Sequence, residues 1–173
     1  MTFDCVFLNG TVGTGKTTTA EMLSKHVSLS GVRNAVIDLD EIRRSWPAPL
    51  DDPFNHELEL RNLASLVGNY RDAGADRFIL AGVIEQRSEL PRYRAAVQSE
   101  GMFVARLVTD PGVLEARLLK RHEGDPEAIE WYLERAVQLA GILETADCDD
   151  RAFDTTDQSA TEVAAAISSS VGW

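Results

Sequence analysis

The sequence contains few of the residues that build disulfide frameworks or zinc sites. Two cysteines, Cys5 and Cys148, and three histidines are spread over 173 residues. Cysteines so far apart do not form a pair with metal-binding spacing, and a reducing compartment is the simpler expectation. The scattered histidines likewise give a zinc site nothing to build on. The chemistry of this protein must therefore be sought in other residues.

Long apolar runs are also missing. No stretch approaches the roughly 20 apolar residues of a membrane span, and no basic segment precedes an apolar one near Met1. The composition, 44% hydrophobic and 26% charged, is that of an ordinary globular protein. We therefore expect a cytoplasmic protein without membrane association, folded as a single domain over residues 1–173.

Basic residues are outnumbered by acidic ones. The chain has 17 Lys and Arg against 28 Asp and Glu, which gives a formal net charge of −11 at pH 7. So acidic a surface repels phosphate backbones, and we expect no stable binding to DNA or RNA. A small-molecule acceptor is favoured over a polymer. The sequence leaves the oligomeric state open.

The most informative segment lies near the N-terminus. A strand-like apolar run, Cys5–Leu8, leads into a glycine-rich turn and then into a helix-forming stretch. The turn matches the phosphate-binding P-loop at every fixed position, with glycine, four residues, then Gly-Lys-Thr. Glycines let backbone N–H groups enclose a phosphate, and the helix N-terminus adds its dipole. The nucleotide contacts expected here are Gly10, Gly13, Thr14, Gly15, Lys16, Thr17 and Thr18.

Two residues of this loop have more specific expected roles. Lys16 should reach the β- and γ-phosphates of a triphosphate and act as a catalytic residue. The hydroxyl of Thr17 should bind Mg²⁺. The alternative, a strand-loop-helix with chance glycines, does not explain why the strand, the loop and the helix all occur in the required order. The loop therefore predicts a nucleoside triphosphate site.

Strand patterns alternate with helix patterns along the whole chain. Short apolar runs predict strands at 5–8, 35–37, 78–81, 103–108 and 152–153. Helical patterns are expected at 16–29, from about 63 to 74, at 88–98, from about 111, from about 126 to 146, and at 159–170. Such alternation indicates an α/β fold in which helices cover both faces of a parallel sheet.

Acidic residues follow the second expected strand. Asp38 and Asp40 lie at its carboxyl end, where ligands collect in open α/β sheets. One carboxylate could take part in Mg²⁺ coordination while the other accepts a proton from an attacking hydroxyl. We assign Asp38 to the metal and substrate side and Asp40 to catalysis, although the sequence leaves open which of them is the base. Arg43 and Arg44 lie three and four residues after Asp40, so either could share its face on a helix. An arginine there suits a planar anionic group on the acceptor, and we assign this role to Arg43. Alternatively, Asp40 only caps a helix.

A pair of arginines follows the fourth expected strand. Arg117 and Arg121 are four residues apart on one helix, and cations there could stabilise the charge of a transferring phosphoryl group. A solvated helix face is the alternative. After the last strand, Asp154 and Thr155 could form an adenine-side loop, although an ordinary polar turn explains them equally well. Arg87, after the third strand, is a further candidate for acceptor binding.

Aromatic residues near the expected site have two interpretations. Trp46, Phe54, Asn55 and His56 flank a proline-rich loop and could form a wall of the acceptor pocket, but core packing is the more frequent role of an aromatic residue near a loop. Trp131 and Trp173 are expected to be packing residues.

These segments resemble the small P-loop kinases. The family includes adenylylsulfate kinase, shikimate and gluconate kinases, chloramphenicol phosphotransferase and polynucleotide 5′-kinase. The resemblance rests on GTVGTGKTT, DLDEIR, RLLKR and the late DTT. It implies a three-layer P-loop NTPase fold, with a five-stranded parallel sheet in the order 2-3-1-4-5 and a helical lid at about 112–128. By the same resemblance Asp40 and Arg43 match the D-x-x-R element of these kinases, and Arg117 and Arg121 match the lid arginines.

The resemblance also implies an activity. We expect an ATP- and Mg²⁺-dependent phosphotransferase that moves the γ-phosphoryl group of ATP to a hydroxyl of a small molecule. An Asp at the end of the third strand is replaced by Ala81-Gly82, which leaves Thr17 and the Asp38/Asp40 pair to support the metal. The GTPase base-recognition run Asn-Lys-x-Asp is absent from the sequence, so ATP is favoured over GTP. One alternative is a nucleoside monophosphate kinase or other phosphate-acceptor kinase. Another is an ATP-binding regulatory module without phosphoryl transfer.

Overall fold

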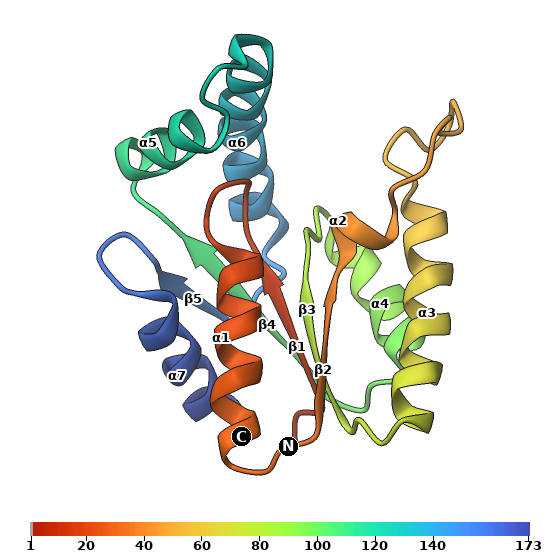
Figure 1. Ribbon diagram of the computed structural model, residues 1–173. Coiled ribbons are helices and arrows are strands. Elements are labelled where there is room, and N and C mark those ends of the chain that lie inside the picture. Colours follow the sequence, from red (N-terminus) through yellow and green to blue (C-terminus); the bar gives the residue numbers. More distant parts are fainter. Residues whose placement is uncertain (1) are drawn as a thin grey trace.

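The computed structural model describes residues 2–173 and is built around a parallel five-stranded sheet (Figure 1). The strands are β1 (Cys5–Asn9), β2 (Asn34–Asp38), β3 (Arg77–Ala81), β4 (Met102–Val108) and β5 (Arg151–Asp154). Their order in the sheet is β2-β3-β1-β4-β5, and every neighbouring pair is parallel. This confirms the predicted fold class and strand order, with β1 in the middle.

Helices cover both faces of this sheet (Figure 1). In chain order they are α1 (Lys16–Leu29), α2 (Leu39–Ile42), α3 (His56–Asp72), α4 (Leu90–Val97), α5 (Pro111–Arg121), α6 (Pro126–Ala146) and α7 (Ala160–Val171). In the view of Figure 1, α1 and α7 lie toward the left and pack against each other on one face of the sheet, while α3 and α4 lie toward the right on the other face. The upper ends of α5 and α6 project beyond the sheet.

Each face of the sheet has its own apolar core. In β1, Cys5 and Phe7 belong to the core beneath α3 and α4, whereas Val6 and Leu8 belong to the core beneath α1 and α7. All four side chains are fully buried. Because a central parallel strand is covered on both sides, its sequence is continuously apolar and does not alternate.

Local signals explain where the later helices begin. Asp110 accepts hydrogen bonds from the backbone N–H groups of Gly112 and Val113 at the start of α5, and Asp125 caps α6 in the same way. A proline follows each of these aspartates, at the position where a missing N–H costs nothing. The helix expected at 88–98 is instead divided into a short 3₁₀ turn, η1 (Arg87–Glu89), and α4. Pro91 lies in the first turn of α4, where proline is tolerated but would break a longer helix.

The carboxyl ends of β1, β2 and β3 all point to the same edge of the sheet (Figure 1). The predicted P-loop follows β1, α2 follows β2, and the loop carrying Glu85 follows β3. Two projections flank this edge: the α5–α6 arm on one side and the loop of residues 43–55 on the other. Within residues 2–173, no helix is long and apolar enough to cross a membrane.

The buried sheet gives a test of the fold. Leu80, in the middle of β3, is fully buried. We expect Leu80→Ala to lower the free energy of unfolding by about 2–5 kcal/mol, because the substitution removes buried methyl groups and leaves a cavity. Urea denaturation would measure the loss. Leu29→Ala is the matched control at an exposed position, where a change within about 0.5 kcal/mol is expected. Similar losses in the two variants would contradict the assigned core.

Candidate active site

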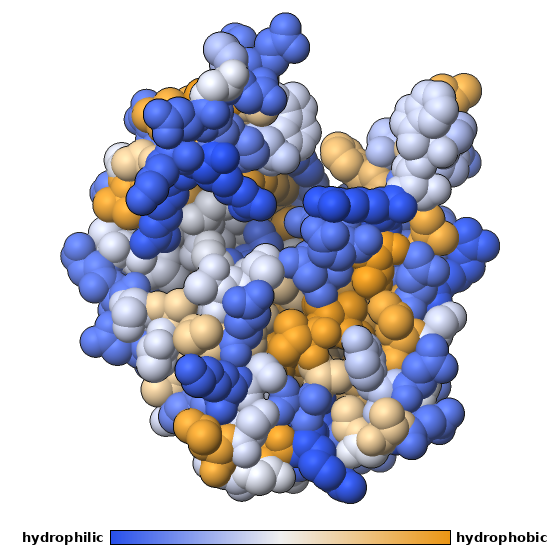
Figure 2. Space-filling model, in the orientation of Figure 1, coloured by the Kyte–Doolittle hydropathy of each residue, from blue (hydrophilic) through white to orange (hydrophobic). Residues whose placement is uncertain are grey.

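A large cleft opens at the carboxyl ends of the strands, with a volume of about 1360 Å³. Its lining comes from the loop after β1, from α2, from the start of α3, from the loop after β3, and from α5 and α6. Figure 2 shows the hollow between the two projections, with hydrophilic side chains on its walls. The cleft is the place where the predicted donor and acceptor residues meet.

The loop after β1 has the geometry of a phosphate cradle. Gly10, Gly13 and Gly15 all have positive φ angles, of 154°, 84° and 90°. A Cβ atom on Gly10 would lie 2.8 Å from the carbonyl oxygen of Leu107, and one on Gly13 would lie 2.9 Å from Leu114. The loop thus needs glycine both for its backbone conformation and for the space it occupies.

The helix after this loop leaves donors for an anion. Its N-cap residue is Gly15, and no side chain caps the first turn of α1. The N–H groups of that turn, together with the helix dipole, form a binding site for negative charge. The residues present therefore fit a nucleotide phosphate.

Lys16 lies across the cradle. Its Nζ donates to the carbonyl oxygens of Gly10, at 2.9 Å, and Thr11, at 3.1 Å. Burial lowers the pKa of Lys16 to about 8, against the opposing attraction of the Asp40 and Asp38 carboxylates. A phosphate group at this position would supply the counter-charge that favours the protonated amine.

Thr17 and Asp38 join the start of α1 to the end of β2. The Thr17 hydroxyl donates to Oδ2 of Asp38 at 2.7 Å. The other oxygen of Asp38 accepts from the backbone N–H of Asp40 at 3.0 Å and caps α2. Within residues 2–173 no group of three or more His, Cys, Asp or Glu could hold a metal on its own. A hydroxyl and a carboxylate fit Mg²⁺, which usually takes its remaining ligands from phosphates and water.

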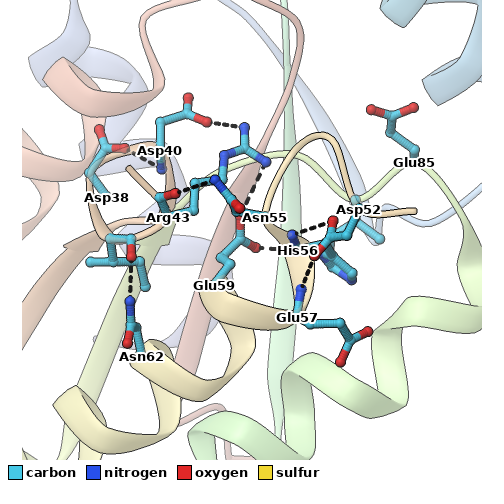
Figure 3. Close-up of polar contacts among 12 residues, drawn as sticks. Asp38, Asp40, Arg43, Asp52, Asn55, His56, Glu57, Glu59, Asn62 and Glu85 are labelled. Atoms are coloured by element: carbon cyan, nitrogen blue, oxygen red, sulfur yellow. Dashed lines mark hydrogen bonds and ion pairs between the residues drawn. The ribbon is translucent and has the colours of Figure 1, made fainter. Parts of the chain in front are cut away.

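A network of charged side chains forms the wall of the cleft opposite the phosphate cradle (Figure 3). Arg43 forms an ion pair with Asp40, three residues earlier, and a second ion pair with Glu59 at 3.2 Å. Glu59 is only 1% exposed, and the Tyr93 hydroxyl donates to it at 2.6 Å. Burial raises the pKa of Glu59, while the Tyr93 hydrogen bond and the Arg43 charge act in the opposite direction. Glu59 thereby holds Arg43, and through it the Asp40 carboxylate.

The loop before α3 is tied to this network. The side-chain amide of Asn55 donates to the backbone carbonyls of Arg43, at 3.1 Å, and Ser45, at 3.0 Å. Asp52 accepts from the N–H groups at the start of α3, above all that of Glu57, and these bonds lower its pKa. His56 then brings a ring nitrogen within 2.8 Å of Glu89. The segment before α3 is therefore ordered by polar contacts made at both of its ends.

Side chains of α6 form a further part of the cleft wall. Arg135 forms an ion pair with Glu85, and its guanidinium lies 5.3 Å from the ring centroid of Phe54. Trp131, also on α6, lines the cleft and is 52% exposed. Trp131 is therefore not the core packing residue that was predicted, although its ring lies edge to face with that of Tyr132, with 4.8 Å between the ring centroids. Trp173, in contrast, packs against the core under α1 and α7.

Arg117 and Arg121 both line the cleft on the side of α5. Arg117 donates to the carbonyl oxygen of Thr155 at 2.7 Å. The Thr155 hydroxyl in turn lies 3.2 Å from the carbonyl oxygen of Thr14, so the loop after β5 is joined to the phosphate cradle. The charge of Arg121 is close enough to Lys16 to lower its pKa.

Five predicted residues lie outside the cleft lining: Gly10 of the cradle, Arg87, Asp154, Trp46 and Asn55. Arg87 donates to the backbone carbonyl of Asp147 and lies 3.5 Å from its carboxylate. Asp154 accepts from the N–H of Thr156 in a local turn, while its neighbour Thr155 lines the cleft. Trp46 is 92% exposed and does not line the cleft, although Phe54 and His56 do.

We call the side of the cleft opposite the phosphate cradle, formed by α2, the start of α3, the loop after β3 and α6, the acceptor wall. Sequence reasoning missed five residues that line or support it: Glu59, Glu85, Glu89, Tyr93 and Arg135. One of them carried a usable signal. Glu59 occupies the same helical stripe as Leu63 and Val67, both fully buried. An acidic residue on the buried stripe of a helix indicates a charged partner inside the protein.

Comparisons with known proteins agree with this fold. A family model described as an AAA domain matches residues 6–138. Among solved structures, a shikimate kinase from Acinetobacter baumannii in complex with shikimate is 19% identical, with 96% of this chain and 91% of that chain covered and a TM-score of 0.60. The Deinococcus radiodurans tunicamycin resistance protein is 23% identical, with coverage of 97% and 95% and a TM-score of 0.61.

A gluconokinase from Sinorhizobium meliloti is 17% identical, with coverage of 99% and 94% and a TM-score of 0.62. At these identities the likeness concerns the fold, and at that level the resemblance to small P-loop kinases is confirmed. No curated protein matches the sequence.

Two glutamates on α3 test the buried network. We expect Glu59→Ala to lower the free energy of unfolding by about 1–3 kcal/mol, because it leaves the buried Tyr93 hydroxyl without its acceptor and leaves Arg43 with Asp40 as its remaining partner. Glu57→Ala, which removes an exposed ion pair with Arg92, should cost less than about 1 kcal/mol. Urea denaturation of both variants would show the difference. A cost for Glu59→Ala no larger than for Glu57→Ala would contradict the network.

Proposed function

The chain belongs to the AAA domain family, and on that premise we propose that it is an ATP- and Mg²⁺-dependent kinase. The acceptor is a hydroxyl of a small molecule, and the transferred group is the γ-phosphoryl of ATP. The observation that carries this proposal is one cleft holding both a phosphate cradle and, opposite it, an Asp40–Arg43 pair fixed by buried Glu59. A protein that only bound ATP would need the phosphate cradle but not the Asp40–Arg43 pair.

On the donor side the loop amides and Lys16 hold the phosphates. Arg117 and Arg121 contribute positive charge from α5, in the segment of about 112–128 that we propose as a lid. Thr155, bonded to both Arg117 and the cradle, contributes to the nucleotide side. Thr17 and Asp38 would hold Mg²⁺, which neutralises phosphate charge when bound.

On the acceptor side Asp40 receives the proton of the attacking hydroxyl. A bond forms between the acceptor oxygen and the γ-phosphorus as the bond to the β-phosphate oxygen breaks, and ADP leaves. Asp38 is less suited to the role of base, because both of its oxygens accept hydrogen bonds, from Thr17 and from the cap of α2. This difference supports Asp40 as the base.

The proposed activity is tested by measuring ADP release from ATP and Mg²⁺ with and without each member of a hydroxyl-compound library. Stimulation by an acceptor, accompanied by a phosphorylated product, is the expected result. Lys16→Ala is the control that excludes a contaminating enzyme, because it removes the charge contact to the phosphates. Slow hydrolysis that no acceptor stimulates would indicate a regulatory module instead. Formation of nucleoside diphosphates from monophosphates would indicate a phosphate-acceptor kinase.

Asp40→Asn tests the proposed base. We expect it to lower kcat by a factor of about 10²–10⁴, the usual contribution of a positioned base, while the Kd for ATP stays nearly unchanged. Single-turnover kinetics and equilibrium nucleotide titration would measure the two quantities. Asp51→Asn, on the exposed loop before α3, removes the same charge outside the cleft lining and should change neither. An unaltered kcat in Asp40→Asn would remove this residue from the mechanism.

A further inference from the structure

The charged side chains of the cleft fall into two groups that differ in how they are paired. On the donor side are Lys16, Arg117 and Arg121. Within residues 2–173 none of these three cations forms an ion pair. Lys16 bonds only to backbone carbonyls, and Arg117 bonds only to threonine hydroxyls and a carbonyl. Their positive charge is available to a polyphosphate.

On the acceptor side every arginine already has a carboxylate partner. Arg43 is held by two, Asp40 and Glu59. The remaining pairs are Arg44 with Glu41, at 3.0 Å, and Arg135 with Glu85. The cation of His56, when protonated, is likewise matched by Glu89 at 2.8 Å. An anionic acceptor would thus meet no unpaired cation on this wall.

The acceptor wall also has more carboxylates than guanidinium groups. Three arginines line it, against four carboxylates, Asp40, Glu41, Glu85 and Glu89. A further carboxylate, Glu59, is buried and pairs with Arg43. A carboxylate or phosphate brought here would have to displace one of these existing partners, and like charges in contact are costly. A cation would instead be attracted to the wall, as well as by the net charge of −11 on the whole chain.

Aromatic rings add to this preference. Phe54 and Trp131 both line the cleft and are about half exposed, at 51% and 52%. The faces of aromatic rings attract ammonium groups, whereas carboxylates and phosphates gain no such attraction. Phe54 already carries the Arg135 guanidinium over its ring, which shows that this surface accepts a cation.

We infer that the acceptor is a hydroxyl compound that carries a protonated amine, and that it is neither a carboxylate nor a phosphate. The inference rests on the proposed kinase activity and identifies the class of its acceptor. The ammonium group would contact the ring of Trp131 and the carboxylates of Glu85 and Glu89. It would share Glu85 with Arg135, and Glu89 with Arg92 and His56. Asp40 would face the hydroxyl that accepts the phosphoryl group.

Matched acceptor series provide the test. Each series keeps one hydroxylated skeleton and varies one charge: an amino sugar, its N-acetyl form and the corresponding sugar acid, or an amino alcohol and the corresponding hydroxy acid. We expect kcat/KM to be at least about tenfold higher for the ammonium member of a series. Equal values for the neutral member, or higher values for the acid, would overturn the inference and leave the kinase activity standing. Stimulation by no member of any charge class would overturn both.

Glu85→Gln tests the electrostatic cause within a single protein. This substitution removes the partner of Arg135 and leaves that guanidinium available to an anion. The ratio of kcat/KM for the amine to that for the hydroxy acid should fall about tenfold or more, while the KM for ATP stays unchanged. Because both acceptors are measured on the same preparation, partial misfolding cancels in the ratio. A ratio that stays at the value of the unsubstituted protein would contradict the proposal.

Glu144→Gln is the matched control for this experiment. Glu144 lies on α6, as Arg135 does, but it is exposed and does not line the cleft. The substitution changes the net charge of the protein by the same amount and should leave the ratio unchanged. An equal fall in the ratio for this variant would show that the preference comes from the overall charge and not from the acceptor wall, and would overturn the assignment of Glu85.

Discussion

A buried carboxylate must be compensated, and the need to compensate Glu59 organises the acceptor half of this protein. The side chain lies against the core of α3 and α4, where an isolated charge would be very costly. Arg43 and Tyr93 supply the compensation, Arg43 at one carboxylate oxygen and Tyr93 at the other. Because Arg43 also pairs with Asp40, the same contacts set the position of the proposed base. The Glu59 side chain therefore links the core beneath α3 and α4 to the proposed catalytic carboxylate.

The donor half depends on a different constraint, the close approach of backbone to backbone. Gly10 passes so near to Leu107 of β4 that no side chain fits between them. The cradle is consequently fixed relative to the central strands. The hydrogen bond from Thr17 to Asp38 then joins the helix after the cradle to the strand that leads to Asp40. Through this bond and the pairing of β2, β3 and β1, the sheet itself sets the separation of donor and acceptor groups.

The two halves also differ in electrostatic character. The cations of the donor half bond to neutral oxygens, so their charge is not neutralised within the protein. Those of the acceptor half are already neutralised by carboxylates. Counting the arginines in the sequence could not reveal this difference, because both halves contain them. What distinguishes the halves is which groups the fold brings within about 4 Å of each guanidinium.

The sequence by itself determined the features that depend on neighbours in the chain. The phosphate cradle, the bounds of α1 and the buried strands follow from glycine positions, apolar runs and helix caps that act over a few residues. The strand order was predicted through the resemblance to a known family, and the comparisons and the sheet confirm it. The i,i+3 pairing of Asp40 with Arg43 is also local and was within reach of sequence reasoning.

Only the tertiary structure decided the acceptor wall. Glu85 and Arg135 are 50 residues apart, and no local pattern indicates that they meet. Arg87 looked suited to the acceptor but is drawn to Asp147, 60 residues later. Trp131 belongs to a helix with an apolar composition, yet its exposure depends on how far α6 projects beyond the sheet. Burial and ion pairing between distant residues are set by how whole elements pack, which is why the acceptor side beyond Asp40 and Arg43 emerged only from the fold.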